Sequence, residues 1–251
     1  MASPTRGRRT TPPADAAGRE LVAKSCRILG KMDLTKAGSG HVSQRVGDDR
    51  VLIRARGSDE LGVRFTTVEQ VIAVDLDGNK LDGPDGLLPP QEVFIHTCLY
   101  RVRPELKSVV HIHPPTVVIF TICDVPLRPI YGAYDPSSLK LVLDGIPTYG
   151  RSITISNEEL GRDLAKIMGG KRACLMRGHG ITTAGASVEE ATVTAIKLNE
   201  LADMHYRAHL LGDPREIDQA DIAHFRGHFK KTGGSTHLGA NWRYYASLSG
   251  E

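Results

Sequence analysis

The chain has 251 residues, of which 40% are hydrophobic and 24% are charged. This composition is typical of a globular protein, and a chain of this length buries about 70% of the surface that its unfolded form exposes. No apolar run approaches the roughly 20 residues that a membrane span requires, so we do not expect the chain to cross a membrane. The 32 Lys and Arg residues nearly balance the 29 Asp and Glu residues, and the net charge of +3 argues against a nucleic-acid partner.

The cysteines and the first residues indicate the compartment. Four cysteines lie far apart in apolar stretches and form no Cys-x-x-Cys pair: Cys26, Cys98, Cys123 and Cys174. This spacing predicts buried free thiols in a reducing, cytoplasmic environment rather than a disulfide framework or a zinc ribbon. Residues 1–17 are rich in Arg, Thr, Pro and Ala but lack the apolar core of a secretory signal, so we expect a disordered N-terminal tail.

A predicted helix, two predicted strands and a second predicted helix follow in order. Residues 16–32 carry apolar side chains at helical spacing, and short apolar runs at 51–53 and 71–74 predict strands. After a Gly- and Pro-rich stretch, residues 91–102 again show helical spacing. Glu92 is therefore expected near a helix N-terminus.

The most informative segment comes next, where residues 109–114 read Val-Val-His-Ile-His-Pro. Alternate residues of a strand point to the same side, so His111 and His113 face the same way. Two neutral imidazoles side by side form half of a divalent metal site. An isolated pair of this kind more often combines one core and one surface histidine, so the rest of the sequence must decide.

The second half of the chain mixes helices and short strands. We expect an apolar segment at 116–122, helices at 157–168, 188–211 and 218–230, and strands at 173–176 and 181–183. Glycines flank His179 between those strands, which lets backbone and metal approach closely but equally suits a plain turn. Without repeats or an evident linker, residues 18–230 are predicted to form one mixed α/β domain. Residues 231–251 are then a C-terminal tail that covers the active site or a neighbouring subunit.

Several motifs in a fixed order carry a resemblance to a known family. Its centre consists of Glu92, His111-x-His113 and Arg177-Gly178-His179-Gly180. Further matching segments are Gly40-His41-Val42-Ser43, Asp75-Leu76-Asp77-Gly78, Tyr100-x-x-Arg103-Pro104-Glu105 and Thr183-x-Gly185. Over residues 20–212 the chain resembles the class II aldolase/adducin family.

The resemblance implies an α/β/α sandwich around a central mixed, mainly antiparallel sheet, assembled as a homotetramer with active sites between subunits. It also implies that His111, His113 and His179 hold one divalent metal ion per subunit, with Glu92 as a fourth ligand or as an acid/base group. Three imidazoles leave open positions where substrate oxygens can chelate, as catalytic sites require. Zinc, manganese, iron and cobalt all accept such ligands, so the sequence does not identify the metal.

The chain departs from sugar-phosphate aldolases of this family where those enzymes bind phosphate with small polar groups. At these places it carries His41, the pair Arg54 and Arg56, and Gln91 before Glu92. Guanidinium groups bind carboxylates bidentately, so we interpret Arg54 and Arg56 as receptors for a substrate carboxylate. The alternative is that both are solvated charges at a strand end. His41 either binds the substrate or braces its own turn.

Residues 132–149 resemble a branch of the family that decarboxylates hydroxylated aromatic or pyridine dicarboxylates, 3,4-dihydroxyphthalate among them. We therefore expect a metal-dependent, non-oxidative decarboxylase, a carbon–carbon lyase of aromatic catabolism. The metal would chelate the ring hydroxyl and the adjacent carboxylate and act as a Lewis acid while carbon dioxide leaves. Glu92, or a tyrosine such as Tyr134, would then protonate the ring carbon.

Three other functions remain open. A class II aldolase for a non-phosphorylated, carboxylated substrate and a non-haem iron oxygenase acting on an aromatic oxo or hydroxy acid would use the same histidines. Outside enzymes, an adducin-like interaction module has the same fold, although adducin head domains lack the full ligand set. For the enzymes we expect a small-molecule carboxylate substrate and neither a nucleic-acid nor a membrane partner.

Overall fold

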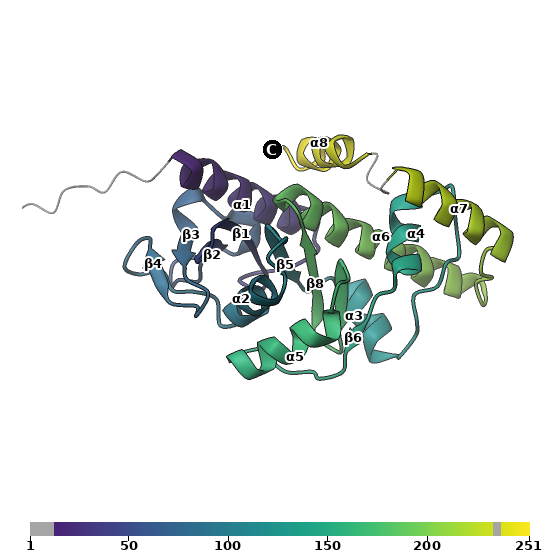
Figure 1. Ribbon diagram of the computed structural model, residues 1–251, viewed down its shortest axis with the longest axis horizontal. Coiled ribbons are helices and arrows are strands. Elements are labelled where there is room, and N and C mark those ends of the chain that lie inside the picture. Colours follow the sequence, from purple (N-terminus) through teal and green to yellow (C-terminus); the bar gives the residue numbers. More distant parts are fainter. Residues whose placement is uncertain (1–12, 233–236) are drawn as a thin grey trace, which may run out of the picture.

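The computed structural model describes residues 13–232 and 237–251, which form one eight-stranded sheet with helices on both faces (Figure 1). The strands are β1 (His41–Gly47), β2 (Arg50–Arg54), β3 (Val71–Val74), β4 (Lys80–Asp82), β5 (Ser108–Ile112), β6 (Thr148–Tyr149), β7 (Ala173–Met176) and β8 (Gly180–Gly185). The helices are α1 (Pro13–Lys31), α2 (Val93–Val102), α3 (Pro115–Ile122), α4 (Pro136–Asp144), α5 (Glu158–Met168), α6 (Val188–Leu211), α7 (Gln219–Thr232) and α8 (Leu238–Leu248).

The sheet has the order β4-β3-β2-β1-β5-β8-β7-β6. Neighbouring strands are antiparallel except β6 and β7, which run parallel. The predicted mixed, mainly antiparallel sheet between two helical layers is confirmed. β5, which carries the His-x-His segment, lies near the middle of the sheet between β1 and β8.

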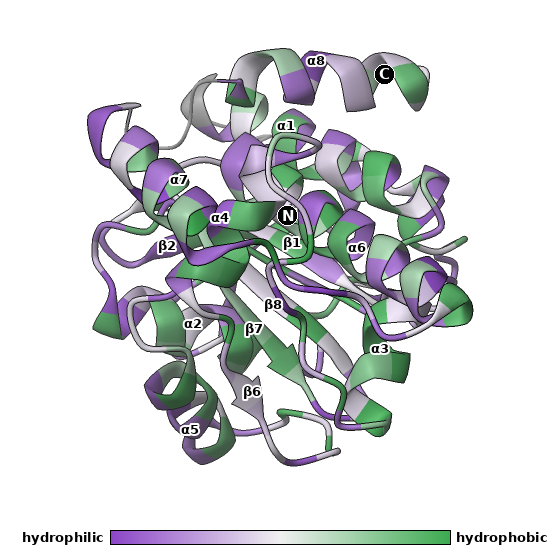
Figure 2. Cartoon of the chain, turned by 90° about the vertical axis from the view of Figure 1, so that its right-hand side faces the viewer, coloured by the Kyte–Doolittle hydropathy of each residue, from purple (hydrophilic) through white to green (hydrophobic). Residues whose placement is uncertain are grey.

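Alternation along the strands creates two hydrophobic cores, one on each face of the sheet. Val110 packs with apolar residues of α1, α3 and α6, whereas its neighbour Val109 packs with those of α2 and α5. Figure 2 shows the apolar strand β7 inside the fold and helices of mixed hydropathy, such as α5 and α6, around it. His111 lies two residues after Val109 on the same strand, so its side chain points to the same face of the sheet, the one that α2 covers.

The two predicted tails differ in how far the structure describes them. The predicted N-terminal tail spans residues 1–17, of which 13–17 belong to α1, while 1–12 lie outside the described residues. In the predicted C-terminal tail, α8 packs on α6 and α1 of its own chain, and the Tyr245 hydroxyl donates to Glu200 Oε1 over 2.8 Å. None of the described residues of this segment, 231–232 and 237–251, lines the metal cavity described below.

Two further expectations concern the cysteines and the membrane. All four cysteines are free thiols, and three of them are buried. Cys123 is exposed, so its predicted burial was wrong; it follows the last residue of α3, where the chain turns back towards solvent. Among the described residues, no helix is both long enough and apolar enough to cross a membrane.

Candidate metal centre and active site

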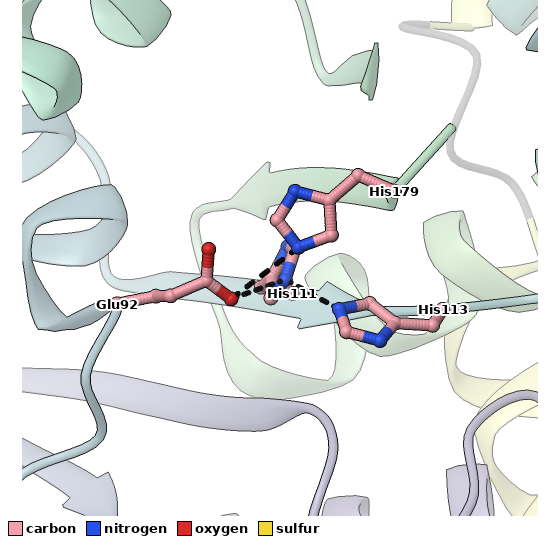
Figure 3. Close-up of side chains that lie close together, drawn as sticks. All are labelled: Glu92, His111, His113 and His179. Carbon is pink, nitrogen blue, oxygen red and sulfur yellow. Dashed lines mark hydrogen bonds and ion pairs between the residues drawn. The ribbon is translucent and has the colours of Figure 1, made fainter. Parts of the chain in front are cut away.

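Four side chains from three separate segments converge beside the end of β5 (Figure 3). His111 is the penultimate residue of β5, and His113 follows immediately after the strand. His179 comes from the tight turn between β7 and β8, which β8 holds against β5 through the Ile112–Ile181 pair. Glu92 is the N-cap residue of α2, but its side chain makes no capping hydrogen bond and points to the histidines instead.

The geometry of this cluster suits a metal ion. One ligand atom from each residue lies within 4.8 Å of all the others. His111 Nδ1 is 3.0 Å from the carbonyl oxygen of Ile181, which only accepts, so His111 carries its proton there when the ring is neutral. The lone pair of His111 Nε2 then faces His113 Nε2 across 2.9 Å. This lone pair is available to a cation, and the set of three imidazoles and one carboxylate fits a divalent metal.

Glu92 is held at both carboxylate oxygens. Oε1 accepts the backbone N–H of Ile155 over 2.8 Å, while Oε2 lies 3.1 Å from His111 Nε2 and 3.4 Å from His179 Nε2. Burial alone raises the pKa of this carboxyl, but the hydrogen bonds and attraction that the His111 and His179 rings offer it in their charged form outweigh burial and hold the pKa below its usual range. Glu92 is therefore an ionised carboxylate, the form that a metal ligand requires.

His113 is neutral for a related reason. Burial, followed by repulsion from His111 and His179, lowers its pKa to about 3. A neutral imidazole keeps a lone pair for a metal, so no proton has to be removed from His113 near neutral pH.

The cluster lies at a cavity of about 500 Å³. The cavity is lined by Gly38, Ser39, Gly40, His41, Arg54, Arg56, Glu60, Pro90, Gln91, Glu92, His113, Thr154 and His179. The structure therefore places the three predicted substrate-binding residues, His41, Arg54 and Arg56, in the same cavity as three of the four predicted ligands. His111 is fully buried behind them.

The two arginines occupy different environments. Arg54 is 2% exposed, and all its guanidinium nitrogens have protein partners. Nε donates to Thr66 Oγ1, Nη1 to the carbonyl oxygens of Gly38 and Gly40, and Nη2 pairs with Glu60. Arg54 thus braces the turn before His41, and these contacts use four of the five N–H groups of its guanidinium.

Arg56 is the available guanidinium. It lies beyond the end of β2, is exposed, and donates through Nε to the carbonyl oxygen of Pro89 over 2.9 Å. Within the described part of the chain, no hydrogen bond reaches its two terminal nitrogens. These nitrogens present the fork geometry that binds a carboxylate.

The structure does not bring Tyr134 to the metal centre of its own chain. Tyr134 is 73% exposed and packs against Tyr131, with ring centroids 5.3 Å apart. It lines a second cavity of about 520 Å³ with Lys197 and Arg207, and none of the described residues lines both cavities.

One buried residue beside the site has no counterpart among the residues predicted from the sequence. His96 of α2 is fully buried, and its Nε2 lies 2.6 Å from His41 Nδ1. Burial and repulsion from His111 lower its pKa to about 3. Its position four residues after Glu92, on the same helix face, is the signal that could have revealed it.

The fold and the cluster together define an α/β sandwich protein with three histidines and a glutamate arranged for one metal ion. Residues 20–206 match the family model described as Class II Aldolase and Adducin N-terminal domain, and the chain belongs to this family. The predicted resemblance is confirmed.

Named relatives include decarboxylases. The 3,4-dihydroxyphthalate decarboxylase of Arthrobacter keyseri is 35% identical over 244 residues, covering 95% of this chain and 96% of that protein. The protein of the same name from Terrabacter sp. (strain DBF63) is 38% identical over 212 residues, with coverages of 83% and 88%. The structure of an aldolase II superfamily protein from Pseudomonas syringae superposes with a TM-score of 0.83 at 22% identity, covering 95% of this chain and 94% of that one, which confirms the fold.

Proposed function

We propose that this protein is a metal-dependent, non-oxidative decarboxylase of a hydroxylated aromatic or pyridine dicarboxylate. The observation that carries the proposal is that Arg56, with free guanidinium nitrogens, lines the same cavity as Glu92, His113 and His179. Sequence identities of 35% and 38% to proteins named 3,4-dihydroxyphthalate decarboxylase support this substrate class. A decarboxylase is a carbon–carbon lyase.

Glu92, His111, His113 and His179 would hold one divalent ion per subunit, for which zinc, manganese, iron and cobalt are candidates. A bound ion would be chelated by the ring hydroxyl and its adjacent carboxylate, and as a Lewis acid it would stabilise the negative charge left as carbon dioxide departs. Glu92 orients the cluster through Oε2, because the Ile155 N–H fixes Oε1. Its lowered pKa makes it a poor proton donor, so we assign it the role of ligand.

Arg56 would bind the second carboxylate of the substrate through its terminal nitrogens, while Arg54 keeps the turn before His41 in place. The other carboxylate, next to the ring hydroxyl, would then be left for the metal side of the cavity. This division of roles revises the interpretation of the two arginines as equivalent receptors.

The proton that replaces carbon dioxide on the ring would come from Tyr134 of a neighbouring subunit. Tyr134 is exposed and lies outside the metal cavity of its own chain, so only a second copy can supply it there. A homotetramer with sites between subunits, as the family resemblance implies, meets this requirement.

The substrate class is tested by product analysis with and without oxygen. We expect the metal-loaded protein to convert 3,4-dihydroxyphthalate anaerobically into carbon dioxide and a dihydroxybenzoate. Arg56→Ala should raise KM at least about tenfold, because it removes a charge-assisted bidentate contact with the substrate. The metal content should not change. Arg162→Ala, which removes an exposed arginine of α5 that does not line the cavity, is the control. An aldehyde product would favour an aldolase, and a requirement for dioxygen would favour an oxygenase; either result would overturn the proposal.

A further inference from the structure

Two rows of polar side chains meet behind the metal cavity, one on a helix and one on a strand. On α2, His96 and Tyr100 continue at four-residue intervals the stripe that begins with Glu92. On β1, His41 and Ser43 share one face, opposite His111 and Val109 of β5. His96, Ser43 and Tyr100 are fully buried, and His41 is 5% exposed. Buried polar groups are costly unless they are paired, and these pair with one another.

The pairs form one continuous chain of hydrogen bonds. Ser43 Oγ lies 2.7 Å from the Tyr100 hydroxyl and 2.7 Å from His96 Nδ1. His96 Nε2 lies 2.6 Å from His41 Nδ1. Both nitrogens of the His96 ring are therefore used inside the protein.

The chemistry of the groups gives this chain a direction. A phenol is a stronger donor than a serine hydroxyl and a weak acceptor, so Tyr100 donates to Ser43. The single Ser43 proton has two acceptors in reach, the Val109 carbonyl oxygen at 3.4 Å and His96 Nδ1 at 2.7 Å, and the shorter contact assigns it to His96 Nδ1. A neutral imidazole has one donor and one acceptor nitrogen, so His96 carries its proton on Nε2 and donates it to His41 Nδ1. His41 then carries its own proton on Nε2. Bonds aligned in one direction strengthen one another in a buried site.

His41 Nε2 is the end of the chain that faces the substrate. His41 lines the metal cavity, and among the described residues no hydrogen bond reaches its Nε2. Its ring centroid lies 5.1 Å from that of His111, a predicted metal ligand. A donor at this place suits a substrate oxygen bound next to the metal.

We propose that Tyr100, Ser43 and His96 are positioning residues that hold His41 as the Nε2–H tautomer, so that His41 donates a hydrogen bond to an anionic substrate oxygen beside the metal centre. The identity of that oxygen as a carboxylate or phenolate rests on the proposed function. The tautomer of His41 does not, because it is set by groups inside the protein.

Two substitutions of His96 separate positioning from simple packing. His96→Gln places an amide where Nε2 was and keeps a donor for His41, whereas His96→Asn places the amide near Ser43 and leaves His41 Nδ1 unpaired. His205→Asn is the control, since His205 is an equally buried helical histidine whose ring bonds the Arg128 carbonyl oxygen away from the cavity.

The readouts are the His41 tautomer, from long-range proton–nitrogen correlation spectra of the zinc-loaded protein, and kcat/KM. We expect one tautomer with the proton on Nε2 in the natural protein and in His96→Gln, and a mixture in His96→Asn. kcat/KM should fall about tenfold in His96→Asn, as for one lost hydrogen bond, and stay within about threefold in His96→Gln and His205→Asn.

A proton on His41 Nδ1 in the natural protein would overturn the inference without any variant. So would a His96→Asn protein with the natural tautomer or with natural kcat/KM. If no hydroxyaromatic dicarboxylate is converted at all, the proposed function fails, while the tautomer spectra still decide the arrangement of this hydrogen-bond chain.

Discussion

Gly180→Ala tests whether close backbone approach builds the metal centre. A Cβ at residue 180 would lie 2.3 Å from the carbonyl oxygen of Ile112 and 2.7 Å from Cδ2 of the His113 ring. Real Cβ contacts are essentially never shorter than 3.0 Å, so residue 180 and the end of β5 must move apart by at least 0.7 Å. Metal–ligand distances tolerate only about 0.2 Å, and the imidazole attached to this segment would leave its place.

We expect Gly180→Ala to weaken metal affinity about 10- to 100-fold, the range seen when groups that orient metal ligands are disturbed. The overpacking should also lower the free energy of unfolding of the metal-free protein by about 1–3 kcal/mol. Competition with a chelating dye measures the first effect, and denaturant unfolding measures the second. Gly150→Ala is the matched control, because a Cβ there meets no atom within 4 Å. Natural metal affinity in Gly180→Ala would refute the reasoning.

Three further predictions concern metal removal, the pH dependence of stability, and the ion pair between Glu60 and Arg54. Removing the metal with a chelator should lower the melting temperature of the natural protein, whereas His179→Ala should bind metal weakly and show little such change in a thermal-shift assay. The metal-free protein should lose stability as pH falls from about 6.5 towards 3, by up to about 1.4 kcal/mol per pH unit for each buried histidine. The sign follows because His96 and His113 have folded pKa values near 3, below the ordinary value of 6.5, so the unfolded chain binds more protons in that window. Acid titration of His96→Gln should show a shallower slope, and an unchanged slope would contradict this account. Glu60→Gln removes the carboxylate that pairs with the buried Arg54 and should cost on the order of 2 kcal/mol in urea unfolding, less than a fully buried pair because Glu60 is partly exposed.

Much of the helical framework could be predicted from local patterns. The helix at 188–211 and the strand at 173–176 have the bounds that their apolar spacing indicated. Strand alternation also predicted that His111 and His113 face the same way, which the cluster requires. These features depend on near neighbours in sequence, which a pattern can represent.

β1 was not predicted, and its buried polar face is the reason. A strand can be recognised from alternating apolar residues only when the side chains on its buried face are apolar. On the face towards α2, β1 instead buries His41 and Ser43. The polar chain that these residues form with His96 and Tyr100 is visible only once the strand is paired with β5. In contrast, α4 had a local signal that was overlooked, since Asp135 caps the helix and Pro136 begins it.

The different roles of Arg54 and Arg56 could not come from spacing alone. Both residues follow the same predicted strand, and both carry a guanidinium group. What distinguishes them is Glu60 and the carbonyl oxygens of the 38–40 turn, which the fold brings around Arg54 from two separate segments. Such long-range contacts decide which charge is free for a ligand.

The central claim is that the Glu92, His111, His113 and His179 cluster, loaded with a divalent metal, removes a carboxylate without oxidation. The most direct measurement titrates the metal-free protein with a divalent metal under anaerobic conditions and follows carbon dioxide released from a hydroxyaromatic dicarboxylate. We predict release that rises with metal, saturates near one ion per subunit, matches the ring product one to one, and is abolished in His113→Ala. Carbon dioxide release that is independent of metal or unchanged in His113→Ala would contradict the account.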